Sequence, residues 1–349
     1  MKRIATSLFC FLTILMFVSV SSAQDKGTLT VAVYGGAWGD IIAKTMFKPF
    51  EQKFGVKVIP EPGASRVTLT KLMQQKGDPL IDVACMDSGI SELALNEGVL
   101  EFMDPNKIPN LQNVLVEALY KNKSGQIYSM GIGFNGFGIT YNKEKVKNKP
   151  TSWFDLWNKD YAGKVTAPSP ANGWGIPFLV FISQLKGGGI NNIEPGIEAL
   201  KKLDVAAYFD ATGATINMFN SGEVIVAAMG CSDGWYLADQ NSKYSVAIPK
   251  EGLITTDPRV HLVKNAKNKE LAEKFINFVA TTEVSKGMAE GLYCGPPITK
   301  GVTLSEKVKE RLPYGPTGSV KDLRFMDWQE INAKRAEMTD RWNKEITRK

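Results

Sequence analysis

The sequence predicts an α/β protein of two units, each a mixed, mostly parallel sheet flanked by helices. Strand-like runs at 28–34, 56–59 and 81–84 are separated by stretches whose apolar residues recur at helical spacing. This βαβαβ order favours parallel strands covered by helices. With 349 residues, 44% of them hydrophobic and 22% charged, the chain is large enough for two domains.

The first unit contains three strand–helix pairs. Apolar residues at helical spacing follow its first strand and predict a helix: Ile42, Met46, Phe47, Phe50 and Phe54. Gly55 is suited to end that helix, because glycine adopts the left-handed conformation common after a helix. Ser65 is expected to cap the next helix. The third strand is followed by a helix that ends near Gly98.

The second unit begins after Tyr141. A short helix is expected at 153–157, capped by Thr151 or Ser152, and a strand is expected to start at Val165. Further segments follow with strand-like or helical patterns. The expected helices are 176–185, 194–203 and 271–279, and the expected strands are 223–229, 244–248 and 260–263. From 304 onward the pattern is polar and helical.

The N-terminus has the layout of a secretory signal peptide over residues 1–23. Lys2 and Arg3 precede an apolar run from 4 to 20, and small residues at 21–23 suit a cleavage site. The alternative is a transmembrane anchor, which the shortness of the run disfavours. Without Lys2 and Arg3 the net charge falls from +6 to +4, and no basic cluster suggests a nucleic-acid partner.

Cysteine and histidine usage gives little support to an enzyme. Cys10 lies inside the expected signal peptide, which leaves an odd number of cysteines: Cys85, Cys231 and Cys294. We expect them to be buried small residues, and their spacing does not suggest a zinc site. His261 is the only histidine, and in a strand-like run it favours a structural role. No nucleophile-elbow, phosphate-loop or metalloprotease motif occurs, so we expect no catalytic residues, cofactor or metal.

A turn at the end of the first strand is a candidate ligand site. Gly35 and Gly36 precede a helix, and Trp38 follows them. Ligands of open α/β sheets bind at the carboxyl ends of strands, where glycines let backbone N–H groups approach. The alternative is a plain turn with Trp38 in the core.

Three segments resemble one family of proteins, in the same order along the chain. They are TSWFDLWNKDYAGKV at 151–165, IPKEG at 248–252 followed by KNAKNKELAEKFINFV at 264–279, and GFNGFGITYNKEKV at 133–146. They are similar to segments of the spermidine/putrescine-binding type of periplasmic solute-binding protein, which serves ABC importers.

The resemblance implies the type II periplasmic binding fold, with two lobes that are joined by two crossings and close on a ligand in the cleft between them. The expected lobe 1 is 24–134 with 253–311, lobe 2 is 135–252, and 312–349 packs on lobe 1. A monomer in the periplasm that delivers a small molecule to an inner-membrane permease is expected. A secreted enzyme and a chemosensory module on the same scaffold remain alternatives.

The chain departs from the polyamine-binding pattern at several positions. Arg66 stands where such proteins tend to carry an acid, and Gly230 stands where a tryptophan is expected. Aligned without a gap, Arg259 takes the place of the family's aspartate, although Asp257 is two residues away. The acidic pair expected near 169–174 is missing.

These departures favour a carboxylate, phosphonate or zwitterion over a polyamine. Arginines would bind an acidic group through paired hydrogen bonds, each worth about 1.5–3 kcal/mol, and would repel a diammonium ligand. Asp87 and Asp233 would instead favour an amino group, and tryptophans would form apolar walls. A polyamine remains the alternative. The predicted ligand-binding residues are Gly36, Trp38, Ser65, Arg66, Asp87, Ser88, Ser169, Asn172, Trp174, Asp233, Trp235, Asp257 and Arg259.

Overall fold

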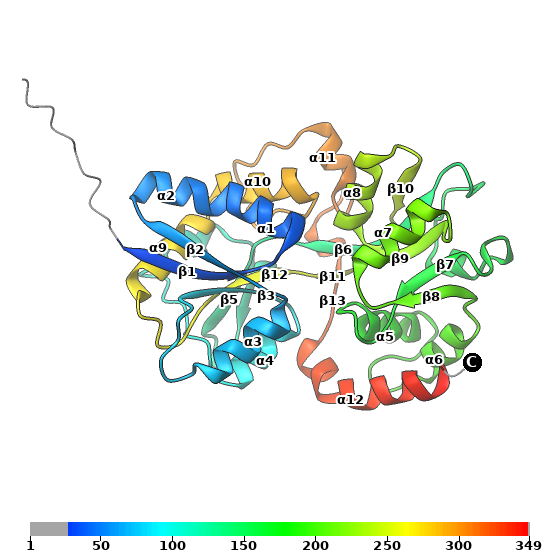
Figure 1. Ribbon diagram of the computed structural model, residues 1–349, viewed down its shortest axis with the longest axis horizontal. Helices are drawn as coiled ribbons and strands as arrows, with labels where there is room; N and C mark the ends of the chain where they lie inside the picture. Colours follow the sequence, from blue (N-terminus) through cyan, green and yellow to red (C-terminus); the bar gives the residue numbers. More distant parts are fainter. Residues whose placement is uncertain (1–26, 348–349) are drawn as a thin grey trace, which may run out of the picture.

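The computed structural model describes residues 27–347, which form two α/β lobes side by side (Figure 1). The expected signal peptide at 1–23 lies outside the described residues. Across 27–347, every helix is too short or too polar to cross a membrane.

Lobe 1 contains a sheet with the strand order β2-β1-β3-β12-β5-β4. The strands β2, β1 and β3 on one side of the sheet are parallel, but β12 is antiparallel to β3 and β5, so the expectation of mostly parallel pairing is too strong. Gly55 ends α2 with a φ of 65°, as its position in the sequence predicts. The elements are β1 (Thr28–Val33), α1 (Gly36–Ile42), a π-helical turn (Ala43–Phe47), α2 (Lys48–Phe54), β2 (Lys57–Pro62), α3 (Ser65–Gln74), β3 (Val83–Asp87), α4 (Ile90–Asn96), β4 (Leu119–Lys121), β5 (Ile127–Gly131), β12 (Pro258–Leu262), α9 (Lys269–Val279) and α10 (Thr282–Leu292).

Lobe 2 contains a second mixed sheet, with the order β13-β11-β6-β9-β7-β8 and with β10 also paired to β6. Ser152 caps the 3-10 helix Trp153–Trp157, one of the two caps that the sequence left open. The elements are β6 (Asn135–Asn142), β7 (Val165–Pro168), α5 (Gly175–Leu185), α6 (Glu194–Lys201), β8 (Val205–Phe209), α7 (Thr212–Ser221), β9 (Val226–Gly230), α8 (Cys231–Gln240), β10 (Tyr244–Ala247) and β11 (Ile254–Thr256).

The chain passes between the lobes three times, once more than expected. It leaves lobe 1 between β5 and β6 and returns between β11 and β12. Because β11 pairs with β6, the return lies near Asp257 rather than at 253. A third passage follows α11 (Glu306–Arg311), where β13 (Arg324–Phe325) pairs with β11 in the sheet of lobe 2.

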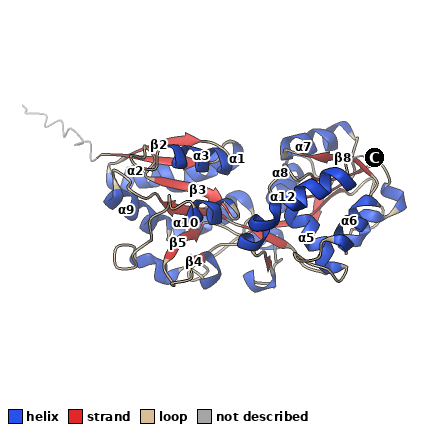
Figure 2. Ribbon diagram, turned by 90° about the horizontal axis from the view of Figure 1, so that it is seen from below, coloured by secondary structure: helices blue, strands red, loops and turns tan. Residues whose placement is uncertain are grey.

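The C-terminal helix α12 (Trp328–Glu345) contacts both lobes, which corrects the expectation that it packs on lobe 1 (Figures 1 and 2). On lobe 1, Asn332 Nδ2 donates a 2.6 Å hydrogen bond to the carbonyl oxygen of Gly89. On lobe 2, an Arg341 guanidinium nitrogen lies 2.6 Å from Glu194 Oε2. Helix α12 therefore bridges the junction between the two lobes.

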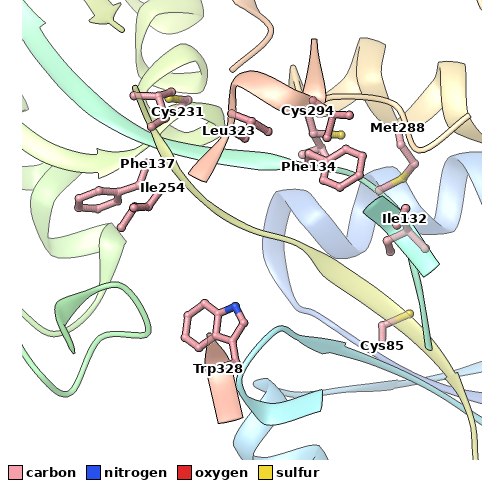
Figure 3. Packing of buried hydrophobic residues seen from close by; sticks show 14 of the residues in the cluster. Cys85, Ile132, Phe134, Phe137, Cys231, Ile254, Met288, Cys294, Leu323 and Trp328 are labelled. Carbon is pink, nitrogen blue, oxygen red and sulfur yellow. The ribbon is translucent and has the colours of Figure 1, made fainter. Parts of the chain in front are cut away.

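The three described cysteines are buried free thiols at separate places in the core (Figure 3). Cys85 lies in β3, Cys231 begins α8, and Cys294 follows α10. Burial raises the pKa of each thiol to about 12. They are inert packing groups, as their scattered positions in the sequence suggest.

Candidate functional site

A cavity of about 320 Å³ lies between the two lobes. Lobe 1 contributes residues that follow β1 and β3, where the carboxyl ends of parallel strands meet. Lobe 2 contributes the residues before α5 and the first turns of α7 and α8, and the crossing strands form a third side. The lining residues are Tyr34, Gly35, Trp38, Asp87, Ser88, Asn135, Asn172, Gly173, Trp174, Thr212, Asp233, Thr256, Pro258 and Trp328.

Three tryptophans from three parts of the chain form apolar walls around this cavity. Trp38 meets the ring of Tyr34 edge to face, with ring centroids 6.1 Å apart. Trp174 stacks on Phe137 at 4.8 Å. Trp328 is 6% exposed and lies at the start of α12, on the lobe 1 side of the close-up in Figure 3. A side chain at Gly89 would place its Cβ 2.8 Å from the Trp328 ring, so glycine lets the indole pack there.

Asp87 is the carboxylate that lobe 1 supplies. It ends β3, and Ser65 Oγ donates a 2.6 Å hydrogen bond to its Oδ2. Ser65 is thus the first residue of α3 and binds Asp87 rather than capping the helix as predicted. Burial raises the pKa of Asp87, and the Ser65 hydrogen bond partly offsets this shift.

Asp233 is the carboxylate that lobe 2 supplies. It lies in the first turn of α8, and no described side chain donates a hydrogen bond to it or forms an ion pair with it. Burial raises its pKa to about 6. A half-buried acid without a partner is costly in its charged form, so an incoming cation would stabilise it.

Arg259 does not line this cavity, which corrects the expectation that it faces a ligand there. It is 1% exposed within lobe 1, where its guanidinium lies 2.6 Å from Glu92 Oε1 and 2.9 Å from Asp257 Oδ2. Its planar head also covers the ring of Tyr120 at 3.4 Å. Asp257 is equally buried and bound to Arg259, so the two neutralise each other instead of binding a solute.

Five more predicted residues lie outside the cavity, and one of them is Ser65, which hydrogen-bonds to Asp87. Ser169 hydrogen-bonds to Asp210, and Trp235 stacks under the Arg311 guanidinium at 4.7 Å. Arg66 is exposed on the first turn of α3. Gly36 lines a neighbouring hollow of about 510 Å³, which shares Trp38 and Asp233 with the cavity.

The cavity therefore brings together Trp38, Asp87, Ser88, Asn172, Trp174 and Asp233 from the predicted set. Gly35, in the turn that the sequence singled out, lines the cavity as well. Sequence reasoning missed Tyr34, Asn135, Gly173, Thr212, Thr256, Pro258 and Trp328. Position after a strand could have indicated Tyr34. Nothing in the sequence indicated Trp328, because the return of the C-terminal segment to the junction is a property of the fold.

His261 has a structural role in lobe 1. Its Nε2 lies 2.7 Å from Ser91 Oγ and its Nδ1 lies 2.8 Å from the carbonyl oxygen of Ala84. Burial lowers its pKa to about 3, so the ring is neutral at physiological pH.

Two α/β lobes around a cavity with aromatic walls define a receptor for a small solute. Residues 45–313 match the family model of bacterial extracellular solute-binding proteins. Because that match covers most of the chain, the protein belongs to this family. The family and its relatives below are solute-binding receptors of ABC transporters, not enzymes.

The similar proteins span nearly the whole chain. The spermidine/putrescine-binding periplasmic protein of Escherichia coli is 26% identical over 339 residues, 94% of each chain. The gamma-aminobutyric acid-binding protein of Pseudomonas aeruginosa is 25% identical over 315 residues, 86% of each chain. A solved spermidine/putrescine transporter substrate-binding protein from Streptococcus pneumoniae superimposes with a TM-score of 0.76, at 20% identity over 92% of this chain and 99% of the other.

Proposed function

We propose that this receptor captures a small organic solute that carries an ammonium group, by closure of the two lobes. The observation that carries the proposal is the charge of the cavity. Asp87 and Asp233 come from opposite lobes, and the described lining residues include no lysine, arginine or histidine. From the arginines at 66 and 259 the sequence favoured a carboxylate, phosphonate or zwitterion. The charge of the cavity favours a zwitterion, or the polyamine alternative, over a solute with negative charge alone.

The carboxylates favour an ammonium group on energetic grounds. Asp233 has no partner to neutralise it, so a cation placed beside it would form a charge-assisted hydrogen bond worth about 1.5–3 kcal/mol. A solute with negative charge alone would face two half-buried acids and no cation. The tryptophan rings can pack against methylene groups, and the faces of these rings attract cations.

The named relatives support the same class. Spermidine, putrescine and gamma-aminobutyric acid, the solutes in their names, all carry an ammonium group. We propose that the mature protein acts in the periplasm as a monomer and delivers its solute to an inner-membrane ABC permease.

Isothermal titration calorimetry with a panel of solutes tests the proposal. We expect binding of straight-chain diamines or ω-amino acids at micromolar or lower concentration, and no heat from dicarboxylates, phosphonates or sugars. Tight binding of a dicarboxylate, together with no measurable binding of any amine, would refute the proposal.

The pH dependence of binding gives a second test. An ammonium solute requires ionised Asp233, whose pKa is about 6, so acidification below that value makes the solute compete with a proton. We expect affinity for a diamine, charged throughout this range, to fall about tenfold between pH 7.5 and pH 5. Calorimetry at both values measures the change, and an affinity that rises on acidification would contradict the role of Asp233.

A further inference from the structure

Gly230 lies beside three residues of the cavity wall, where β9 ends and α8 begins. A Cβ at this position would lie 3.0 Å from Asp233 Oδ2, 3.5 Å from Asn135 Nδ2 and 3.8 Å from Trp174 Nε1. All three residues line the cavity, and they come from α8, from β6 and from the turn before α5. One acceptor and two donors therefore meet beside a residue without a side chain, where a solute atom can approach the backbone closely.

The Asn135 amide presents a donor to this place. Its Oδ1 accepts hydrogen bonds from Ser232 Oγ at 3.0 Å and from the Ser232 backbone N–H at 3.4 Å. Because a backbone N–H can only donate, the amide atom beside it is the oxygen, and the NH2 group points to the Gly230 side. Asn135 is 8% exposed, and its Nδ2 has no acceptor among the described residues. This donor is therefore fixed in direction and free to bind a solute.

The Trp174 indole supplies the second donor. Its ring is held by stacking on Phe137, with ring centroids 4.8 Å apart. Trp153 and Trp157 each donate the Nε1 proton to a backbone carbonyl oxygen, whereas no described residue accepts from Trp174 Nε1. Two uncharged donors without acceptors thus lie next to the Asp233 carboxylate. Because an unpaired donor away from bulk water is costly, a solute oxygen that accepts from both would be stabilised.

We propose that Asn135, Trp174 and Gly230 form a subsite for an uncharged oxygen of the solute, a hydroxyl or carbonyl oxygen close to its ammonium group. This inference rests on the proposed function, because Asp233 holds that ammonium group beside the two donors. The donors are uncharged, and the described lining residues include no lysine, arginine or histidine. A neutral oxygen therefore fits this place better than a carboxylate, which Asp233 would repel. The subsite selects amines with an oxygen on the neighbouring carbon over amines with a plain methylene chain.

Calorimetry with matched pairs of solutes tests this selection. The pairs are gamma-aminobutyric acid with its β-hydroxy derivative, and putrescine with hydroxyputrescine. In both hydroxylated members, the hydroxyl group is on the carbon next to an aminomethyl group. We expect the unaltered protein to bind the hydroxylated member of each pair about 10-fold more tightly. Trp174→Phe removes one donor but keeps an aromatic ring, and it should reduce the preference to about 3-fold or less.

Gly230→Ala tests the same place without removing a donor. The backbone angles of Gly230, φ −59° and ψ 133°, are allowed for alanine, so the substitution should not strain the chain. Its methyl group would obstruct the approach to Asp233 and the two donors. We expect it to lower affinity for the hydroxylated solutes about 10-fold and to remove the preference for them. Trp157→Phe and Gly77→Ala make the same chemical changes outside the cavity lining and should leave the preference unchanged.

The outcomes separate this inference from the function on which it rests. If the unaltered protein binds both members of each pair equally, or if the preference survives both Trp174→Phe and Gly230→Ala, the oxygen subsite is wrong. The ammonium site still stands in that case if Asp233→Asn weakens binding of both members. If the unaltered protein binds no diamine and no ω-amino acid, hydroxylated or not, the proposed function fails and the subsite fails with it. Circular dichroism confirms that each variant is folded before titration.

Discussion

Replacement of Arg259 by methionine is expected to lower the free energy of unfolding by about 3–5 kcal/mol. The guanidinium is the shared partner of Glu92 and Asp257, all three of which are buried. Methionine fills much of the same volume but leaves two carboxylates without a cation in the interior of lobe 1. Urea denaturation followed by tryptophan fluorescence measures the change in the transition that reports on this lobe.

Two further variants identify the cause of this loss. Lys264→Met removes one charge from an exposed site just after β12 and should change stability by less than about 0.5 kcal/mol. The double variant Arg259→Met/Glu92→Gln should recover part of the lost stability, because it removes the Glu92 charge that Arg259→Met leaves unpaired. If Arg259→Met unfolds at the same urea concentration as the unaltered protein, the ion cluster does not stabilise lobe 1.

Asp233→Asn is expected to weaken binding of an ammonium solute by about 2–3 kcal/mol, which corresponds to roughly 30- to 150-fold. The amide keeps the shape of the side chain but loses the charge that attracts the cation. Calorimetry with a diamine measures the loss. The remaining binding should also lose most of its dependence on pH between 5 and 7.5.

Stability distinguishes this effect from a loss of fold. Burial raises the pKa of Asp233 from its usual value near 3.8 to about 6, so its contribution to stability is complete below pH 3.8 and is lost as pH rises through 6. Asp233→Asn without solute should therefore be at least as stable as the unaltered protein at pH 7.5. Asp204→Asn, at an exposed site in lobe 2, is the control and should bind normally. A variant at 233 that is destabilised yet binds normally would show that Asp233 serves the fold.

The sequence was sufficient to predict the two α/β units and several residues of the cavity. Strand ends are visible in the pattern of apolar residues, and the side chains that follow them meet at one edge of the sheet. That rule led to Trp38, Asp87 and Asp233, all of which line the cavity. The order of the family segments supplied the two-lobe arrangement.

The roles of the arginines were not predictable, because local sequence does not reveal which charges neutralise each other. In the sequence Arg259 seemed free to bind a ligand, but it pairs with Glu92, which lies 167 positions earlier in the chain. Ser65 looked like a helix cap, yet its hydroxyl binds Asp87, 22 positions later. Trp328 was missed because only the third passage between the lobes brings it to the cavity.

One consequence concerns the strands on which a captured solute would rest. Asn135, Thr256 and Pro258 flank the points where the chain passes from one lobe to the other, and all three line the cavity. A guest molecule in that position touches the backbone that must bend when the lobes move. If the lobes close on the solute as proposed, its length would limit how far they can approach each other.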